Sequence, residues 1–131
     1  NPGMTMLTVN ALVAADDVVI PLIPDAFGAA GLEKINDYID QAKAYNEDIH
    51  VIGCVATMFN GRASQIRTIR KIMDKNTIPV FDTCISASEA VNTALEQRKP
   101  ISLHRRKSNV AADYRNLMQE YVGRVCNGKK E

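Results

Sequence analysis

The order of apolar patterns in residues 4–24 constrains the fold of this chain most strongly. Helical spacing over residues 4–15 gives way to a β-branched run at residues 18–23, and Pro24 follows. A helix, then a strand, then a turn into another helix is one repeating unit of a parallel α/β sheet. Pro21 has no N–H to donate to a ladder, so we expect it near a sheet edge or a bulge.

The same alternation continues to the end of the 131 residues without a linker or an internal repeat. Apolar spacing predicts helices over residues 31–46, 64–74, 86–97 and 110–125, with Ser86 or Ser88 as the cap of the third. Isoleucines 66, 69 and 72 and Met73 are expected to face inward. The remaining apolar runs, residues 49–59 and 78–81, predict strands. The expected fold class is α/β, with a three-stranded parallel sheet flanked by helices, in one domain over residues 1–131.

Composition excludes several classes of protein. Apolar residues make up 46% of the chain and charged residues 24%, and no apolar stretch approaches the roughly 20 residues that span a bilayer. We see no secretory signal, so a cytoplasmic protein without membrane attachment is expected. The three cysteines form no CxxC pair, which favours reduced thiols over disulfides or zinc, and Cys54 is expected in the core.

Charge is distributed unevenly along the chain. Residues 1–50 carry eight acidic and two basic side chains, whereas residues 51–131 carry fourteen basic and seven acidic ones. Such a split indicates that the second part faces a polyanion, or that the two parts face each other or a partner. Solvated faces of unequal sign are the simpler alternative.

Two basic clusters predict binding to the phosphate backbone of DNA, without sequence preference. The first follows one arc of the 64–74 helix, and the second precedes the last helix. The predicted DNA-binding residues are Arg62, Arg67, Arg70, Lys71, Lys75, Arg105, Arg106 and Lys107.

Catalytic motifs are not found in the sequence. No GxxxxGK[ST] run offers the backbone N–H groups and lysine that surround phosphates, and Gly28 and Gly31 are read as a turn between a strand and a helix. HExxH motifs, nucleophile elbows and Cys/His pairs at ligand spacing are also missing. We therefore predict no catalytic residue and no metal ligand.

Short motifs in a specific order resemble the ParA/Soj family of plasmid and chromosome partition ATPases. They run from Pro2 to Val122 and include Leu7-Thr8-x-Asn10-Ala11-Leu12, Ala15-Asp16, Ile20-Pro21, Thr57-Met58-Phe59, Val80-Phe81-x-Thr83, Lys99-Pro100-Ile101 and Ala112-x-Tyr114. The resemblance implies the C-terminal part of a P-loop NTPase fold of the ParA/MinD type. The phosphate loop and the magnesium-linked aspartates would then lie upstream of Asn1, in a half that this chain lacks.

The resemblance also implies ligands and partners. Full-length relatives use ATP and Mg, dimerise around ATP, coat DNA in the nucleoid and respond to a ParB-like centromere-binding protein. It places the adenine near Asn60 and near Ile85, Ser86 and Ser88. The chain departs from the family here, because Ser86-Ala87-Ser88 replaces the usual Pro-Arg-Asn and removes an arginine credited with DNA contact. Asn60 is also compatible with a turn residue of left-handed backbone before Gly61.

Two functions remain open at this point. One is the C-terminal region of a partition ATPase, which alone should not hydrolyse ATP because the groups that stabilise the transferred phosphoryl are missing. The other is a non-enzymatic module of the same fold that binds DNA or a partner. A MinD-like membrane-site ATPase is a weaker third, because the chain's end lacks an apolar, basic amphipathic tail.

Overall fold

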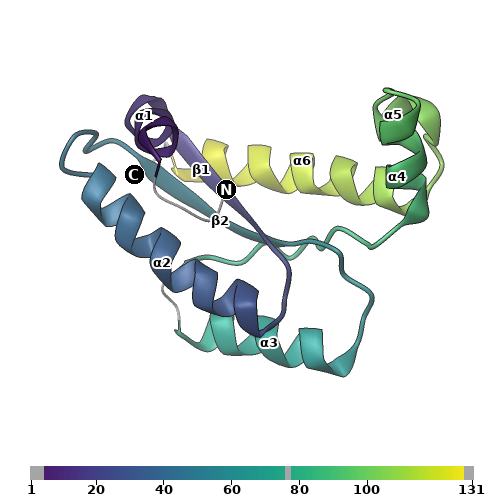
Figure 1. Ribbon diagram of the computed structural model, residues 1–131, viewed down its shortest axis with the longest axis horizontal. Coiled ribbons are helices and arrows are strands. Elements are labelled where there is room, and N and C mark those ends of the chain that lie inside the picture. Colours follow the sequence, from purple (N-terminus) through teal and green to yellow (C-terminus); the bar gives the residue numbers. More distant parts are fainter. Residues whose placement is uncertain (1–4, 76–77, 129–131) are drawn as a thin grey trace.

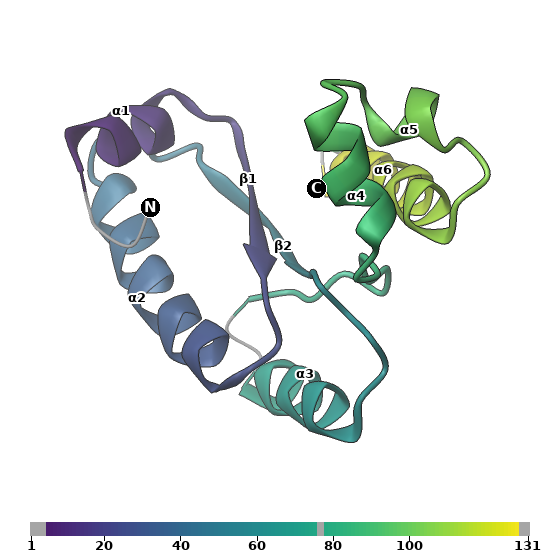
Figure 2. The same ribbon diagram turned by 45° about the vertical axis from the view of Figure 1, so that its right-hand side comes forward.

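A computed structural model describes residues 5–75 and 78–128. The elements follow the order α1 (Met6–Ala14), β1 (Asp17–Leu22), α2 (Ala26–Ala42), β2 (His50–Ala56), α3 (Ala63–Lys75), α4 (Glu89–Glu96), α5 (Ile101–His104) and α6 (Asn109–Gly128). Helices α2 and α3 cover one face of the sheet and α6 the other, as Figures 1 and 2 both show. The predicted α/β class and parallel sheet are confirmed.

Strands β1 and β2 pair in parallel, from Asp17 opposite His50 to Leu22 opposite Ala56. The register shifts between Val18 and Val19, which face Val51 and Gly53, so Ile52 is an extra residue in β2. Such a bulge sharpens the local twist of a strand. Pro21 lies exposed on β1, a strand that pairs only with β2 within the described residues, in accord with the edge position predicted for it.

Side chains that alternate along the strands form two cores, one on each face of the sheet. Ile20, Leu22 and Cys54 point toward α2 and α3, where Leu32, Ile39, Ile72 and Ile78 join them. Val55 lies on the other face with Phe81, Ile85 and Val110. Cys54 is fully buried, as the sequence predicted.

The prediction of a third strand at residues 78–81 is wrong. The segment runs beside β2 but makes a single bridge, between Cys54 and Val80. Cys54 N donates to Pro79 O at 2.7 Å, and Phe81 N donates to Cys54 O at 2.9 Å. The ladder goes no further in either direction: Pro79 has no N–H for Ile52 O, which accepts from Arg124 instead, and Thr83 N donates to the carboxylate of Glu120 on α6.

The predicted turn at Gly28 and Gly31 is also wrong, because α2 begins at Ala26 and contains both glycines. Asp25 caps this helix, and its Oδ1 accepts from Gly28 N at 2.7 Å. A Cβ at Gly28 would lie 2.0 Å from the carbonyl oxygen of Ile23, so only glycine lets the helix start this close to β1. The turn itself is Pro24 and Asp25.

Other boundaries differ from the prediction in smaller ways. Helix α4 starts at Glu89, three residues later than expected, and Ser88 is its cap, with Oγ accepting from Ala90 N. The short helix α5 was not predicted. On α3 only Ile72 is buried; Ile66 and Met73 are 36% and 51% exposed, so the inward face is narrower than the spacing indicated.

Candidate functional site

Two loops that follow β2 and the Phe81 segment are held side by side. Phe59 N donates to Ile85 O at 3.0 Å, and Ala87 N donates to Phe59 O at 2.9 Å. This parallel bridge joins Phe59 and Ser86. The bridge brings together the two segments near which the family resemblance implies the adenine, although 25 or more residues separate these segments in the chain.

A hollow of about 370 Å³ opens beside this bridge. Ile85, Ser86 and Ser88, three of the four residues predicted to hold a nucleotide, line it. The rest of the lining comes from β2's exit, from α4 and from α6, and consists of Thr57, Met58, Ala87, Glu89, Val91, Asn92 and Tyr114. The volume falls in the range of small-molecule sites, roughly 300–1,000 Å³.

The floor of the hollow is rigid. Ile85 is 5% exposed and packs in the second core. Ser86 N donates to Asp113 Oδ2 at 2.9 Å, which ties the segment to α6. The Ser88 hydroxyl is engaged as the cap of α4. A flat apolar ring can therefore rest on Ile85 and Val91 without reordering the backbone beneath it.

Met58 lies at the rim with an unusual backbone. Its φ is +51°, in the left-handed region that a side chain disfavours, and the side chain is 57% exposed. The carbonyl oxygen of Met58 accepts from Gln65 Nε2 at 3.1 Å, which helps hold this conformation. Strained backbone beside a hollow is typical of binding sites.

Asn60, the fourth predicted nucleotide residue, does not line the hollow. Its N–H donates to Gln65 Oε1, and its own Oδ1 accepts from Arg62 N at 3.2 Å. Both groups shape the turn before α3. Asn60 is thus a turn residue. The left-handed backbone that the sequence suggested for Asn60 is found at Gly61 instead, with a φ of +75°.

The analysis of the sequence did not predict Tyr114 and Asn92 as site residues, because both fit the faces of ordinary helices. Tyr114 is 47% exposed although Val110 and Leu117, each about one turn away along α6, pack in the second core. An aromatic side chain on the edge of an apolar helical stripe was the available signal.

ATP and Mg, implied by the resemblance, fit this chain only in part. The hollow suits a nucleobase by volume and by its apolar floor. Within residues 5–75 and 78–128, no group of three acidic, histidine or cysteine side chains is placed to hold a metal ion. The sequence contains no phosphate loop either. Within the described residues, the hollow therefore matches a nucleobase in size, and no cluster of side chains matches a metal ion.

The predicted DNA-binding residues fall on two separate surfaces. Arg62, Arg67 and Arg70 are exposed at the entrance and on the outer side of α3, while Arg105, Arg106 and Lys107 are exposed between α5 and α6. Helix α3 and the α5 region lie far apart in both views (Figures 1 and 2). They do not form the continuous stripe that a single contact with DNA would need.

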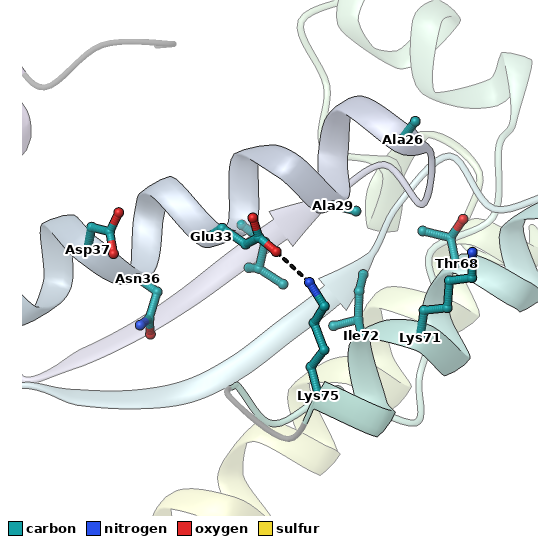
Figure 3. Close-up of a pocket in the computed structure, with 10 residues that line it drawn as sticks. Ala26, Ala29, Glu33, Asn36, Asp37, Thr68, Lys71, Ile72 and Lys75 are labelled. Carbon is teal, nitrogen blue, oxygen red and sulfur yellow. Dashed lines mark hydrogen bonds and ion pairs between the residues drawn. The ribbon is translucent and has the colours of Figure 1, made fainter.

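Lys71 and Lys75 face a different environment from the arginines of α3. Both line a groove of about 440 Å³ between α2 and α3, and the α2 side of this groove carries Glu33 and Asp37 (Figure 3). Lys75 Nζ forms an ion pair with Glu33. The hydrogen bond and the charge of Lys75 hold the pKa of Glu33 below its ordinary value.

None of the helices in the described part of the chain is both long and apolar enough to cross a membrane.

Comparison with known proteins supports the family resemblance. A family model described as an AAA domain matches residues 1–51. The chromosome partitioning protein ParA of Myxococcus xanthus is 31% identical over 128 residues, which cover 94% of this chain and 44% of that protein. The sporulation initiation inhibitor protein Soj of Bacillus subtilis is 29% identical, over 91% of this chain and 48% of its own.

Solved structures share the fold. McdA from Cyanthece superimposes with a TM-score of 0.70 at 18% identity, over 94% of this chain and 48% of McdA. Cobyrinic acid a,c-diamide synthase from Mycobacterium smegmatis, with a bound ATP analogue and magnesium, gives a TM-score of 0.71 at 24% identity, over 88% of this chain and 42% of that enzyme.

The fold of this chain is thus the α/β fold that McdA and this synthase share. The sequence relatives include chromosome partitioning proteins named ParA. The chain is similar to proteins of the ParA/Soj family over more than nine tenths of its own length, and it spans just under half the length of these curated relatives.

Proposed function

We propose that this chain is a region of a ParA-like partition ATPase that acts in plasmid or chromosome segregation. The observation that carries the proposal is the alignment with ParA, which runs along 94% of the chain. The whole protein would dimerise in an ATP-dependent manner, bind DNA without sequence preference and respond to a ParB-like partner. In the cell it would be cytoplasmic and associated with the nucleoid.

Within that protein, the hollow lined by Ile85, Ser86 and Ser88 would receive the base. When bound, ATP would supply the phosphoryl group for hydrolysis, and Mg would neutralise the negative charge of its phosphates. The residues of this chain would bind and orient the base by stacking on the apolar floor, and the Asp113 hydrogen bond to Ser86 N would keep that floor in place. We derive no hydrolytic step from this chain, because its sequence has no phosphate loop.

The basic clusters would provide the DNA contact. Arg105, Arg106 and Lys107 follow one another in an exposed turn between two helices. Three cations at one place release condensed counterions from a duplex without reading its bases. The exposed face of α3 would give a second, independent contact.

The proposal is tested by measuring duplex DNA affinity across a potassium chloride series by fluorescence anisotropy. We expect log K to fall steeply with log salt, and a variant with Arg105, Arg106 and Lys107 changed to glutamine to lose up to about three units of slope. Lys43→Gln serves as a control, because Lys43 is paired with Asp40 in the acidic part of the chain. A flat salt response of the wild type would contradict the DNA-binding part of the proposal.

A non-enzymatic binding module is the second candidate, favoured by the missing GxxxxGK[ST] run. A module of this kind would bind DNA with the same salt dependence, but it would not bind an adenine nucleotide in the hollow. Fluorescent adenine nucleotides should bind the hollow under the first proposal, and Val91→Glu, at its apolar floor, should weaken them. No nucleotide binding together with salt-dependent DNA binding would favour the module.

A further inference from the structure

The groove between α2 and α3 has no part in the proposed function. Its floor is apolar, because Leu32 and Ile72 are each 5% exposed there. Two small side chains, Ala26 and Ala29, leave room on the α2 wall. A concave apolar floor of about 440 Å³ between two exposed helices is large enough to receive several side chains of another molecule.

The walls carry charges of both signs in a definite order. The ion pair between Glu33 and Lys75 crosses the middle of the groove, and Asp37 and Lys71 lie toward its opposite ends (Figure 3). Neither Asp37 nor Lys71 has an ion-pair partner among the described residues. Asp37 lies four residues beyond Glu33 on α2, and Lys71 lies four residues before Lys75 on α3. Four residues span about 6 Å of a helix, so the two free charges are about 12 Å apart along the groove.

This pattern disfavours a polyanion. The charge of Lys75 is already balanced by Glu33, so Lys71 is the one lysine of the groove without an ion-pair partner among the described residues. A single free cation attracts a polyanion weakly, because phosphate backbones are bound through several cations at once. The groove instead complements an occupant with both signs of charge and an apolar middle.

An α-helix meets these requirements in its own geometry. Residues i and i+8 of a helix are about 12 Å apart along the axis and are turned by about 80° from each other. Charged side chains at these two positions therefore point toward opposite walls. The residue at i+4, halfway between them, faces the floor.

We propose that the groove between α2 and α3 docks an amphipathic helix of a partner protein. An acidic residue of that helix pairs with Lys71, a basic residue eight positions away pairs with Asp37, and apolar residues between them rest on Leu32 and Ile72. This is helix-in-groove recognition, in which apolar contacts supply affinity and the flanking charges set which helices fit.

Three synthetic helical peptides test the proposal. They share one apolar face and differ only at positions i and i+8, which carry Glu and Lys, Glu and Glu, or Lys and Lys. Their affinity for the 131-residue chain is measured by anisotropy of a dye on the peptide. Because the two paired contacts are exposed, we expect the mixed peptide to bind about two- to fivefold more tightly than either uniform one.

A charge change in the groove should reorder the series. With Lys71→Glu both ends of the groove are acidic, and the Lys and Lys peptide should become the tightest binder. Arg67→Glu is the matched control, since Arg67 is exposed one turn earlier on α3 and does not line the groove. It makes the same change in net charge and should leave the order as in the wild type. Circular dichroism checks that both variants remain folded.

Several results would overturn the proposal. Equal affinities of the three peptides for the wild type would show that the charges do not select a helix. An unchanged order with Lys71→Glu, or the same reordering with Arg67→Glu, would show that binding lies elsewhere. Displacement of the peptide by duplex DNA that depends on Lys71 would assign the groove to DNA. Peptide affinity that falls as the chain self-associates would assign the groove to a second copy.

Discussion

Glu120 and Arg124, one turn apart on α6, are joined by an ion pair of 2.7 Å between Oε1 and Nη2. Together they replace the hydrogen bonds that a third strand would have made. Glu120 accepts from the N–H groups of Asp82 and Thr83, and Arg124 donates to the carbonyl oxygens of Ile52 and Val80. The Arg124 guanidinium also stacks 4.2 Å from the centre of the Phe81 ring. A helix thereby fastens an irregular segment to the sheet.

Removal of the Glu120 carboxylate should destabilise the fold. Glu120→Ala leaves two backbone N–H groups and the guanidinium without their acceptor, and the expected loss is about 2 kcal/mol in the free energy of unfolding. Urea denaturation followed by circular dichroism measures it. Glu120→Gln keeps an acceptor oxygen and should lose less. Equal losses for the two variants would contradict the assigned hydrogen bonds.

Stability should fall at acid pH partly because of this residue. Burial, the largest single influence on the Glu120 carboxyl, opposes its ionisation, but the hydrogen bonds from Asp82, Thr83 and Arg124 together outweigh burial and lower its pKa below 4.5. Because the pKa of Glu120 is lower in the folded chain than in the unfolded chain, its ionised carboxylate stabilises the fold at pH values above the pKa of the unfolded state. This stabilisation is lost as the pH falls through the pKa of the folded state. Unfolding curves between pH 6 and pH 3 should therefore be less pH-dependent for Glu120→Gln than for the wild type.

Gly53 should not tolerate a side chain. Its φ is +150°, and a Cβ would lie 2.7 Å from Pro79 O and 2.9 Å from Arg124 Nη1. Gly53→Ala is expected to cost about 3 kcal/mol in unfolding free energy, because both strain and a backbone clash oppose it. Gly123→Ala is the control: no atom lies within 4 Å of its added Cβ, so on α6 it should stabilise by up to about 1 kcal/mol. A neutral Gly53→Ala would contradict the backbone described here.

Arg98→Gly should stabilise the chain. Helix α4 ends with Lys99 N donating to Ala94 O and Arg98 N donating to Leu95 O, and Arg98 has a φ of +50°. Glycine is the usual residue at this position of a helix end, because it adopts left-handed backbone without a penalty. We expect a gain of about 1 kcal/mol in a thermal or urea unfolding experiment. Gln97→Gly, one residue earlier with a φ of −83°, should destabilise instead.

The basic residues of α3 should contribute unequally to DNA affinity. Arg67 and Arg70 are exposed and have no ion pair within the described residues, so changing both to glutamine should reduce the salt slope by about two units. Lys75→Gln should change the slope less, because Glu33 already balances that charge. A salt titration of duplex binding compares them, and a larger effect of Lys75→Gln would argue against this arrangement.

How much of the fold could be predicted depended on whether its signal was local. Long apolar runs predicted β2, and helical spacing predicted α3 and α6 to within one residue or two at most ends. The start of α2 was missed because Gly28 and Gly31 are typical of turns, and only the close approach to Ile23 O explains glycine inside a helix. The prediction of a strand at residues 78–81 was wrong because Pro79 has no N–H for the ladder and because Glu120, nearly 40 positions away, takes the N–H of Thr83 that would have extended it.

The candidate site divides in the same way. Ile85, Ser86 and Ser88 were predicted through the resemblance, and they do line one hollow. Asn60 was assigned to the same site, but its hydrogen bonds with Gln65 and Arg62 turn it to the loop. Tyr114 reaches the hollow from α6. Its position at the edge of the apolar stripe could have marked it as partly exposed, but only the packing of α6 decided which hollow it lines.

By itself, the sequence determined the α/β alternation, the buried position of Cys54 and the similarity to ParA/Soj proteins, because periodicity and ordered motifs are properties of the chain alone. Only the tertiary structure decided which charges meet. Lys71 and Lys75 share a helix with Arg67 and Arg70, and the sequence grouped all four as one basic stripe. The packing of α2 beside α3 places Glu33 against Lys75 and brings Asp37 into the groove that both lysines line. Their electrostatic environment therefore depends on a contact that forms across some 40 residues of chain, and spacing along one helix does not contain it.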